Sequence, residues 1–176
     1  VHGRAPGCLI GGCGGGGSSV GVTRMGGVQH GVDLERSEAY VAQFGEAGFT
    51  QGDMHDTALV RGLLERHRPC VAFYTPPCQL YSPVNFIAQR VGTTGVSADN
   101  PRSLYETRST LRMLEGAGIM VIGENTSGAS SEMRALFVHV SVLHGCQFGI
   151  RTHRARLIGT SFEMVCGGLD SAASRK

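Results

Sequence analysis

The chain has 176 residues, of which 41% are hydrophobic and 17% charged, so it is too apolar for a disordered protein and of a length that favours one domain. Its formal net charge of +2 at pH 7 is only mildly basic and by itself identifies no nucleic-acid-binding protein. No apolar run approaches the length of a membrane span, and the first residues lack the charged and hydrophobic regions of a signal peptide.

Strands and helices are predicted to alternate along the first third of the chain. A short strand over residues 7–10 leads into the glycine-rich loop "GGCGGGGSSVG", which is followed by a helix over 18–25. A second strand over 28–33 comes next, and "LERSEAYVAQF" has its apolar residues at helical spacing. The stretch "FTQGD" then predicts a third strand, which exits at Asp53.

The middle of the chain continues this order. Asp56 is predicted to cap a helix over 57–67, and Pro69 stops that helix. The run "CVAFY", residues 70–74, has the pattern of a buried strand. A polar and glycine-rich stretch over 91–99 is typical of a long surface loop.

The last third repeats the alternation once more. A helix is predicted to begin at residue 101 and to end at 116, and the buried strand "IMVIGEN" follows it. A helix around 131–137 and two strands, within 140–150 and 154–162, complete the elements. This order predicts an α/β fold with a mostly parallel sheet and helices on both faces.

Six cysteines are spread along the chain with no C-x-x-C pair and no zinc-binding spacing with histidine. A disulfide framework is not expected in a chain with this much apolar sequence, and several of the cysteines lie in apolar runs that are typical of buried positions. The sequence therefore predicts free thiols, no metal site and a reducing compartment.

One cysteine stands apart. Cys78, in "TPPCQLYS", follows the predicted strand 70–74, and Pro76 and Pro77 stiffen the chain before it because each fixes φ and donates no backbone hydrogen bond. Ligands of open α/β sheets bind beyond the carboxyl ends of the strands, so Cys78 is a candidate nucleophile. A buried, unreactive thiol is the alternative interpretation.

Three further features fall at the ends of predicted strands. The glycine loop has the composition that lets backbone approach a cofactor closely, although a flexible linker explains a glycine run equally well. Asp33 is placed to accept both hydroxyls of a ribose, or to cap the helix that follows. Asp53, or the backbone beside it, is placed to receive an adenine amino group.

Three motifs, in this order and spacing, resemble the cytosine-5 DNA methyltransferase family, including its short phage-type members. They are "TPPCQLYS", the "EN" of "IGENTSGA" and the paired arginines of "THRARLIGTSF". The resemblance runs from Leu9 to Phe162 and implies a Rossmann-like S-adenosylmethionine-dependent methyltransferase domain over 1–162, with a short tail over 163–176. Relatives that methylate nitrogen have an aromatic residue in place of Cys78, so the cysteine indicates carbon as the methyl acceptor.

The resemblance also implies the chemistry. The Cys78 thiolate would add to carbon 6 of cytosine and make carbon 5 nucleophilic, which is covalent catalysis. Glu124 would protonate or hydrogen-bond ring nitrogen 3, and Arg156 would bind the carbonyl oxygen, with Arg154 serving the cysteine loop or a phosphate. Asn125 would hold the cysteine loop in place. Because carbon 6 of a stacked base is out of reach, the implied partner is DNA with a flipped-out cytosine.

The implied methyl donor is S-adenosylmethionine, a sulfonium whose methyl carbon is already activated, so no metal is required. The residues assigned to the cofactor are Ile10, Gly12, Gly14, Gly15, Asp33, Leu34, Asp53, Met54 and Pro77. The catalytic set is Cys78, Gln79, Glu124, Asn125, Arg154 and Arg156.

The sequence departs from the family pattern in several places. Ile10 stands where the family has a phenylalanine that stacks on adenine, and Thr152 stands where a glutamine opens the arginine motif. In the family, a target-recognition domain and a closing cofactor motif follow the arginine pair, whereas residues 163–176 are too few to read a DNA sequence. We therefore expect that recognition is relaxed, that another chain supplies it, or that the fold is a non-catalytic scaffold. Methyltransferases that act on tRNA share these motifs, so an RNA substrate is also open.

Overall fold

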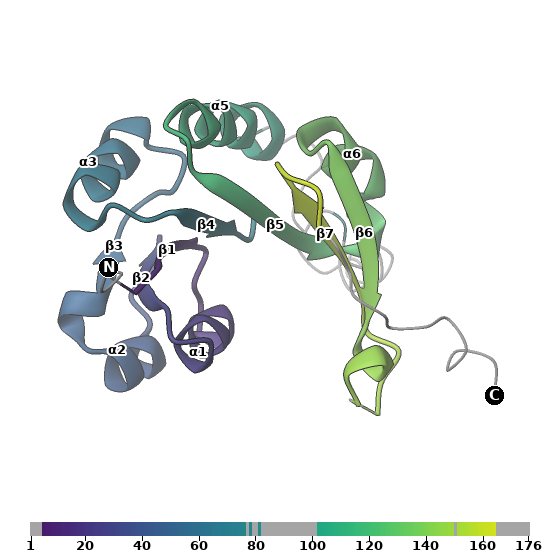
Figure 1. The fold of residues 1–176 in the computed structure, drawn as a ribbon, viewed down its shortest axis with the longest axis horizontal. Coiled ribbons are helices and arrows are strands. Elements are labelled where there is room, and N and C mark those ends of the chain that lie inside the picture. The colour runs from purple at the N-terminus through teal and green to yellow at the C-terminus, as the bar shows by residue number, and fades with distance from the viewer. Residues whose placement is uncertain (1–4, 77, 79–80, 82–101, 150, 165–176) are drawn as a thin grey trace, which may run out of the picture.

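A computed structural model describes residues 5–76, 78, 81, 102–149 and 151–164 (Figure 1). Its strands form one seven-stranded sheet in the order β3-β2-β1-β4-β5-β7-β6. Every neighbouring pair is parallel except for β7, which runs antiparallel to both β5 and β6. The predicted α/β fold with a mostly parallel sheet is confirmed.

The first half of the chain follows the predicted order closely. Its elements are β1 (Gly7–Gly11), α1 (Gly17–Arg24), β2 (Val28–Asp33), α2 (Glu38–Phe44), the 3₁₀ turn η1 (Glu46–Gly48), β3 (Phe49–Gln51), α3 (Thr57–His67) and β4 (Val71–Tyr74). The Asp56 side chain caps α3, as predicted, by accepting from the amides of Ala58 and Leu59 at 2.9 and 3.2 Å. Helix α2 begins only at Glu38, because the Ser37 side chain caps it.

The second half departs more from prediction. Its elements are α5 (Arg102–Gly116), β5 (Met120–Thr126), η3 (Ser127–Ala129), α6 (Ser130–Leu136), β6 (His139–His144), η4 (Gly145–Phe148) and β7 (Ala155–Thr160). The strand expected within 140–150 is wrong in its second half, which forms the 3₁₀ turn η4. Strand β5 continues to Thr126 by pairing with β7, so Glu124 lies within the strand and not at its exit. The predicted loop 91–99 and the helix start at 101 lie outside the described residues.

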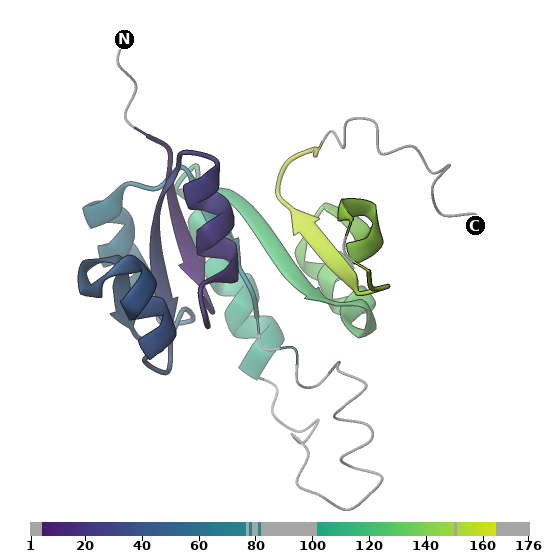
Figure 2. The same ribbon diagram turned by 90° about the horizontal axis from the view of Figure 1, so that it is seen from below.

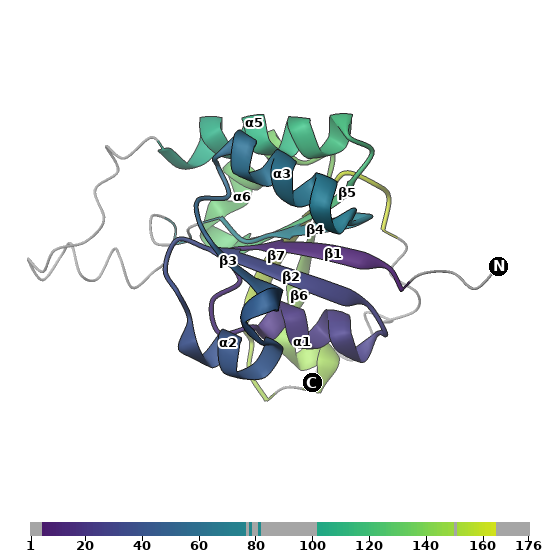
Figure 3. The same ribbon diagram turned by 90° about the vertical axis from the view of Figure 1, so that its left-hand side faces the viewer.

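Helices cover the two faces of the sheet unequally (Figure 3). Helices α3, α5 and α6 lie on one face, and α1 and α2 lie on the other, over β1, β2 and β3. The larger core cluster lies under α3, α5 and α6 and includes Leu9, Val60, Ala72 and Leu114. A smaller cluster lies under α1 and α2 and is made of Cys8, Ile10, Cys13 and Tyr40. Neighbouring residues of β1 divide between the clusters because strand side chains alternate between faces.

One aromatic ring packs across the paired strands β5 and β7. Phe137, directly after α6, is 4% exposed. A Cβ atom added at Gly123 of β5, or at Gly159 of β7, would lie 2.3 Å from that ring, and these two glycines are partners in the register. The Phe137 ring therefore packs against the backbone at Gly123 and Gly159. Any residue other than glycine at either position would collide with the ring. This packing aligns the two strands that carry Glu124 and Arg156.

The cysteines within the described segments are all free thiols, and Cys166 lies outside those segments. In the same part of the chain, no three His, Cys, Asp or Glu side chains are grouped as they would be around a metal ion. No helix there is both long enough and apolar enough to cross a bilayer.

Candidate active site

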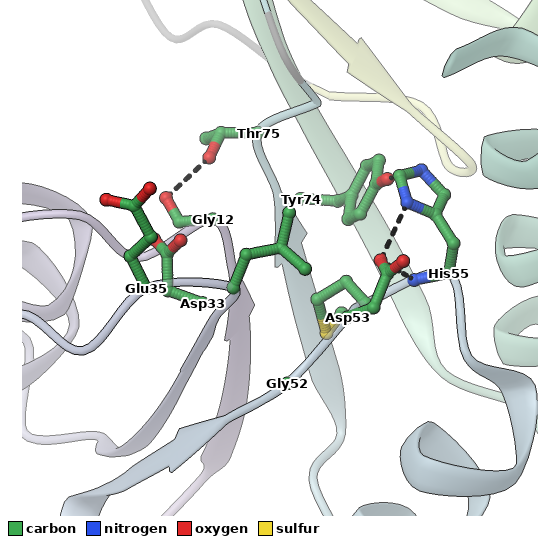
Figure 4. Close-up of a pocket in the computed structure, with 10 residues that line it drawn as sticks. Gly12, Asp33, Glu35, Gly52, Asp53, His55, Tyr74 and Thr75 are labelled. Carbon is green, nitrogen blue, oxygen red and sulfur yellow. Dashed lines mark hydrogen bonds and ion pairs between the residues drawn. The ribbon is translucent and has the colours of Figure 1, made fainter. Parts of the chain in front are cut away.

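A pocket of about 360 Å³ opens at the carboxyl ends of β1, β2, β3 and β4 (Figure 4). Its lining residues are Gly12, Asp33, Leu34, Glu35, Gly52, Asp53, Met54, His55, Tyr74 and Thr75. Five of them, Gly12, Asp33, Leu34, Asp53 and Met54, were assigned to the cofactor from the sequence. The other five were missed.

The start of the glycine loop is clamped to the end of β4. The Thr75 hydroxyl donates to the carbonyl oxygens of Gly11 and Gly12 at 3.0 and 2.8 Å, and the Thr75 amide donates to Gly11 at 3.0 Å. Gly12 has φ +70°, and a Cβ atom there would lie 2.6 Å from the Thr75 hydroxyl oxygen. A side chain at position 12 would therefore be strained in its backbone and would collide with Thr75. This end of the loop is held in place, unlike a flexible linker.

Asp33 ties the same loop to the end of β2. Its carboxylate Oδ2 accepts from the Gly14 amide at 2.8 Å, and its carbonyl oxygen accepts from the Gly52 amide at 2.8 Å. Asp33 does not cap α2, because Ser37 does, so the helix-cap interpretation is wrong. No hydrogen bond joins Oδ1 to any part of the chain that the structure describes, which leaves this oxygen free to accept from a ligand.

Asp53 belongs to a hydrogen-bonded series that ends on α5. Its Oδ1 accepts from the amide of His55 at 2.8 Å and from His55 Nδ1 at 2.9 Å (Figure 4). With Nδ1 donating, His55 Nε2 accepts from the Tyr74 hydroxyl, and it lies 3.1 Å from the Thr107 hydroxyl. Burial raises the pKa of Tyr74, so its hydroxyl stays protonated as a donor. Asp53 Oδ1 is thus occupied, whereas Oδ2 accepts no hydrogen bond from the residues that the structure describes.

Of the pocket residues that the sequence analysis missed, His55 had a local sequence signal and Tyr74 had none. The contact from Asp53 to the His55 amide two positions ahead is a local aspartate turn, so the spacing "DMH" could have identified His55. Tyr74 lies 19 positions from His55 and meets it only because β3 and β4 end at the same edge. No local pattern identifies a contact of that kind.

Several predicted cofactor residues lie away from this pocket. Ile10 is completely buried among Cys8, Cys13 and Tyr40, so its side chain does not face the pocket and the prediction of a cofactor contact is wrong for that side chain. Gly14 and Gly15 are exposed in the loop, and neither lines the pocket. Pro77, like Gln79 of the catalytic set, lies outside the described residues.

Cys78 is exposed, which contradicts the interpretation of a buried thiol. The Asn125 side chain, 3% exposed, donates to the carbonyl oxygen of Pro76 at 3.4 Å and so ties the segment before Cys78 to β5. Cys8 and Cys13 differ sharply, because burial raises the pKa of their thiols to about 11 and about 12. Those two thiols stay protonated at neutral pH and are poor nucleophiles.

Glu124 and Arg156 form an ion pair, with Arg156 Nε 2.7 Å from Glu124 Oε1. Arg156 lies opposite Thr126 in the β5–β7 register, so the antiparallel course of β7 brings its first residues to the carboxyl end of β5. Their side chains are 25% and 28% exposed, so the pair is open to a ligand. Glu124 is thus paired with the arginine that the resemblance assigns to the carbonyl oxygen of the base. Arg154 is exposed, and its carbonyl oxygen accepts from the Gly145 amide.

Solved structures with similar folds include two proteins whose identity to this chain is low. One is a mutant DNMT2 from Spodoptera frugiperda, 19% identical, matched over 89% of this chain and 49% of that one with a TM-score of 0.62. The other is the methyltransferase EhMeth from Entamoeba histolytica, 14% identical, matched over 92% of this chain and 54% of that one with a TM-score of 0.63. No protein-family model matches the chain, and no curated protein matches its sequence.

These likenesses define the class of fold. The chain has the Rossmann-like fold of S-adenosylmethionine-dependent methyltransferases, as predicted, and it spans about half the length of the two solved structures. At such low identity the likeness concerns the fold, and the chemistry must be argued from the side chains.

Proposed function

We propose that this chain transfers a methyl group from S-adenosylmethionine to carbon 5 of a cytosine in DNA through a covalent adduct with Cys78. The observation that supports the proposal is that the elements carrying three groups reach the same end of the sheet. Exposed Cys78 follows β4, Asn125 ties that segment to β5, and the Glu124–Arg156 pair joins the ends of β5 and β7.

The neighbouring pocket fits S-adenosylmethionine, which supplies an electrophilic methyl group when bound. Its lining includes the carboxylates of Asp33, Glu35 and Asp53, which suit a ligand with a positive sulfonium, ribose hydroxyls and an adenine amino group. The oxygens left free, Oδ1 of Asp33 and Oδ2 of Asp53, are the acceptors we assign to the ribose and the amino group. Gly12 lets the ligand approach the backbone closely.

The residues of the chain would activate the base in sequence. The Cys78 thiolate forms a bond to carbon 6 and pushes electron density onto carbon 5, while Glu124 and Arg156 hold the ring nitrogen and the carbonyl oxygen. Carbon 5 would take the methyl group as the sulfur–methyl bond of the donor breaks and leaves a neutral thioether, and it would then lose its proton to a base. The bond from sulfur to carbon 6 then breaks and returns the thiolate. Asn125 acts as a positioning residue through the backbone before Cys78.

Trapping on an oligonucleotide with 5-fluorocytosine tests the proposal. Fluorine at carbon 5 cannot leave as a proton does, so the adduct persists and shifts the protein on a denaturing gel. We expect wild type to be trapped in the presence of S-adenosylmethionine and Cys78→Ser not to be trapped. Cys70→Ser is the matched control, since Cys70 is also exposed but lies at the opposite end of β4. Equal trapping of wild type and Cys78→Ser would disprove the mechanism.

Two alternatives are separated by variations of this experiment. An RNA oligonucleotide with the same modified base tests the RNA substrate that related motifs allow. A non-catalytic scaffold is the rival from another class, and the burial of Ile10, which leaves no stacking side chain in the first loop, favours it. Calorimetry separates the two classes: absence of heat with S-adenosylmethionine at millimolar concentration supports the scaffold.

A further inference from the structure

One stretch of the chain contains basic residues and no acidic ones. Residues 133–162 contain four of the 16 basic residues and none of the 14 acidic ones, so the rest of the chain has a net charge of −2. The four are Arg134, Arg151, Arg154 and Arg156. Three of them lie close together, at the start of β7 and in the turn before it. The mild overall charge therefore conceals a local basic surface.

The described residues of the turn between β6 and β7, 145–149 and 151–154, project beyond the sheet and include η4 (Figure 1). Hydrogen bonds fold the tip. The His144 amide donates to the Gln147 side chain at 2.7 Å, and the Gly149 amide donates to Cys146 at 3.2 Å. At the base, the Gly145 amide donates to the Arg154 carbonyl oxygen at 3.1 Å. The projection has a defined shape before any partner binds, which lowers the entropic cost of binding.

An aromatic ring and cations are exposed on this projection. Phe148 is 58% exposed, and Arg151, His153 and Arg154 are all exposed. Within the described segments, no acidic side chain pairs with Arg151 or Arg154. A bare aromatic ring beside unpaired arginines is the combination that single-stranded nucleic acids bind, because bases stack on the ring and phosphates pair with the guanidinium groups.

The projection also lies next to the proposed catalytic residues. Its base is β7, where Arg156 contacts Glu124, and this is the sheet edge at which the Cys78 segment is tied by Asn125. We propose that Phe148 and Arg151 bind the nucleic acid strand that carries the target base, with Phe148 stacking on an unpaired neighbouring base and Arg151 contacting a phosphate. The role in presenting the target rests on the proposed function, whereas the binding itself is measured without chemistry.

Fluorescence anisotropy with labelled single-stranded DNA, single-stranded RNA and duplex DNA tests the surface on the full chain. We expect Phe148→Ala to weaken single-strand binding about 10-fold. Arg151→Ala should reduce the dependence of log affinity on log salt by about one phosphate contact. Arg61→Ala, an exposed arginine of α3, and Met25→Ala, an apolar side chain that is 87% exposed, are the matched controls and should bind like wild type.

Two results would overturn the inference: Phe148→Ala and Arg151→Ala binding like wild type, or wild type binding none of the three nucleic acids. Tighter binding of DNA or of RNA decides which polymer the surface serves. Failure of the proposed function can be distinguished from failure of this inference. Cys78→Ser should bind as wild type does but not be trapped on 5-fluorocytosine, whereas Phe148→Ala should still be trapped at saturating oligonucleotide.

Discussion

The two halves of the sheet are built differently. The half made of β3, β2, β1 and β4 has helices on both faces, whereas the helices described over β5, β7 and β6 lie on one face only. Figure 2 shows this from below, with α1 and α2 in front of the first strands and no helix in front of β5 and β7. We call them the cofactor half, after Asp33 and Asp53, and the catalytic half, after Glu124 and Arg156. Cys78 follows β4, the strand at which the two halves meet.

The side chains follow this difference. In the cofactor half, Asp33 and Asp53 are each held through one oxygen by backbone or ring donors at the pocket wall. In the catalytic half, Glu124 alternates with buried Val121 and Asn125 along β5 and points to the face on which the described residues form no helix. A pocket enclosed by ordered backbone suits a small ligand, and an open face suits a polymer whose base must enter from outside.

Arg156→Ala should give the largest effect and should separate the halves. Removing the guanidinium leaves Glu124 without its partner and the base without its oxygen ligand, so we expect turnover to fall by about 10²–10⁴-fold. Affinity for S-adenosylmethionine should change by less than about twofold, because the pocket lies in the other half. Single-turnover methylation and calorimetry measure the two quantities.

Arg134→Ala, an exposed arginine of α6, is the control for that experiment and should change neither quantity. A loss of cofactor affinity with turnover intact would show that Arg156 serves the cofactor and not the base.

His30 gives the cofactor half a predicted sensitivity to acid. Its side chain is buried between β2 and α3, stacks on His67 with ring centroids 4.0 Å apart, and hydrogen-bonds the Thr50 hydroxyl. Burial, with His67 and Arg66 nearby, lowers the pKa of His30 from 6.5 to about 4. Between these values the unfolded chain binds more protons, so stability should fall as pH drops from 6.5 towards 4, by up to about 3 kcal/mol from this residue.

Urea unfolding at pH 7.5 and at pH 4.5 measures this contribution as a difference between wild type and His30→Gln. The loss of stability on acidification should be smaller in the variant. Exposed His139, changed to Gln, is the control for titration of an ordinary histidine. If wild type and His30→Gln lose the same free energy, the buried imidazole does not control the acid response.

Asp33→Asn should give the smallest effect. In contrast to Arg156→Ala, it should change cofactor affinity and leave turnover nearly unchanged. The amide oxygen can still accept from the Gly14 amide, but the side chain loses its charge and one acceptor, so we expect about 10-fold weaker binding of S-adenosylmethionine. Turnover at saturating cofactor should stay within about threefold of wild type.

Thermal melting is the check on that variant, with exposed Glu38→Gln as the control. A large drop in melting temperature with unchanged cofactor affinity would show that Asp33 stabilises the loop and does not bind the cofactor.

Local sequence patterns predicted an element well where the packing of the fold favours the same secondary structure as the local sequence does. The Asp56 cap and the apolar stripe placed α3 correctly, and the strand over 28–33 was confirmed without change. Pocket residues were predicted where a strand simply ends, as at Asp33. Ile10 was assigned to the cofactor because it stands where the family has a stacking phenylalanine. Its side chain is instead buried beside Tyr40, on a face of β1 that only the packing of α2 decides.

The sequence by itself determined the order of most elements and the end of the strand that precedes Cys78, because periodicity, caps and prolines act over a few neighbouring residues. Only the tertiary structure decided that β7 enters antiparallel between β5 and β6, with Phe137 flat against Gly123 and Gly159. That non-local pairing sets Arg156 beside Glu124, 32 positions away, since strand partners are chosen by the packing of the whole sheet.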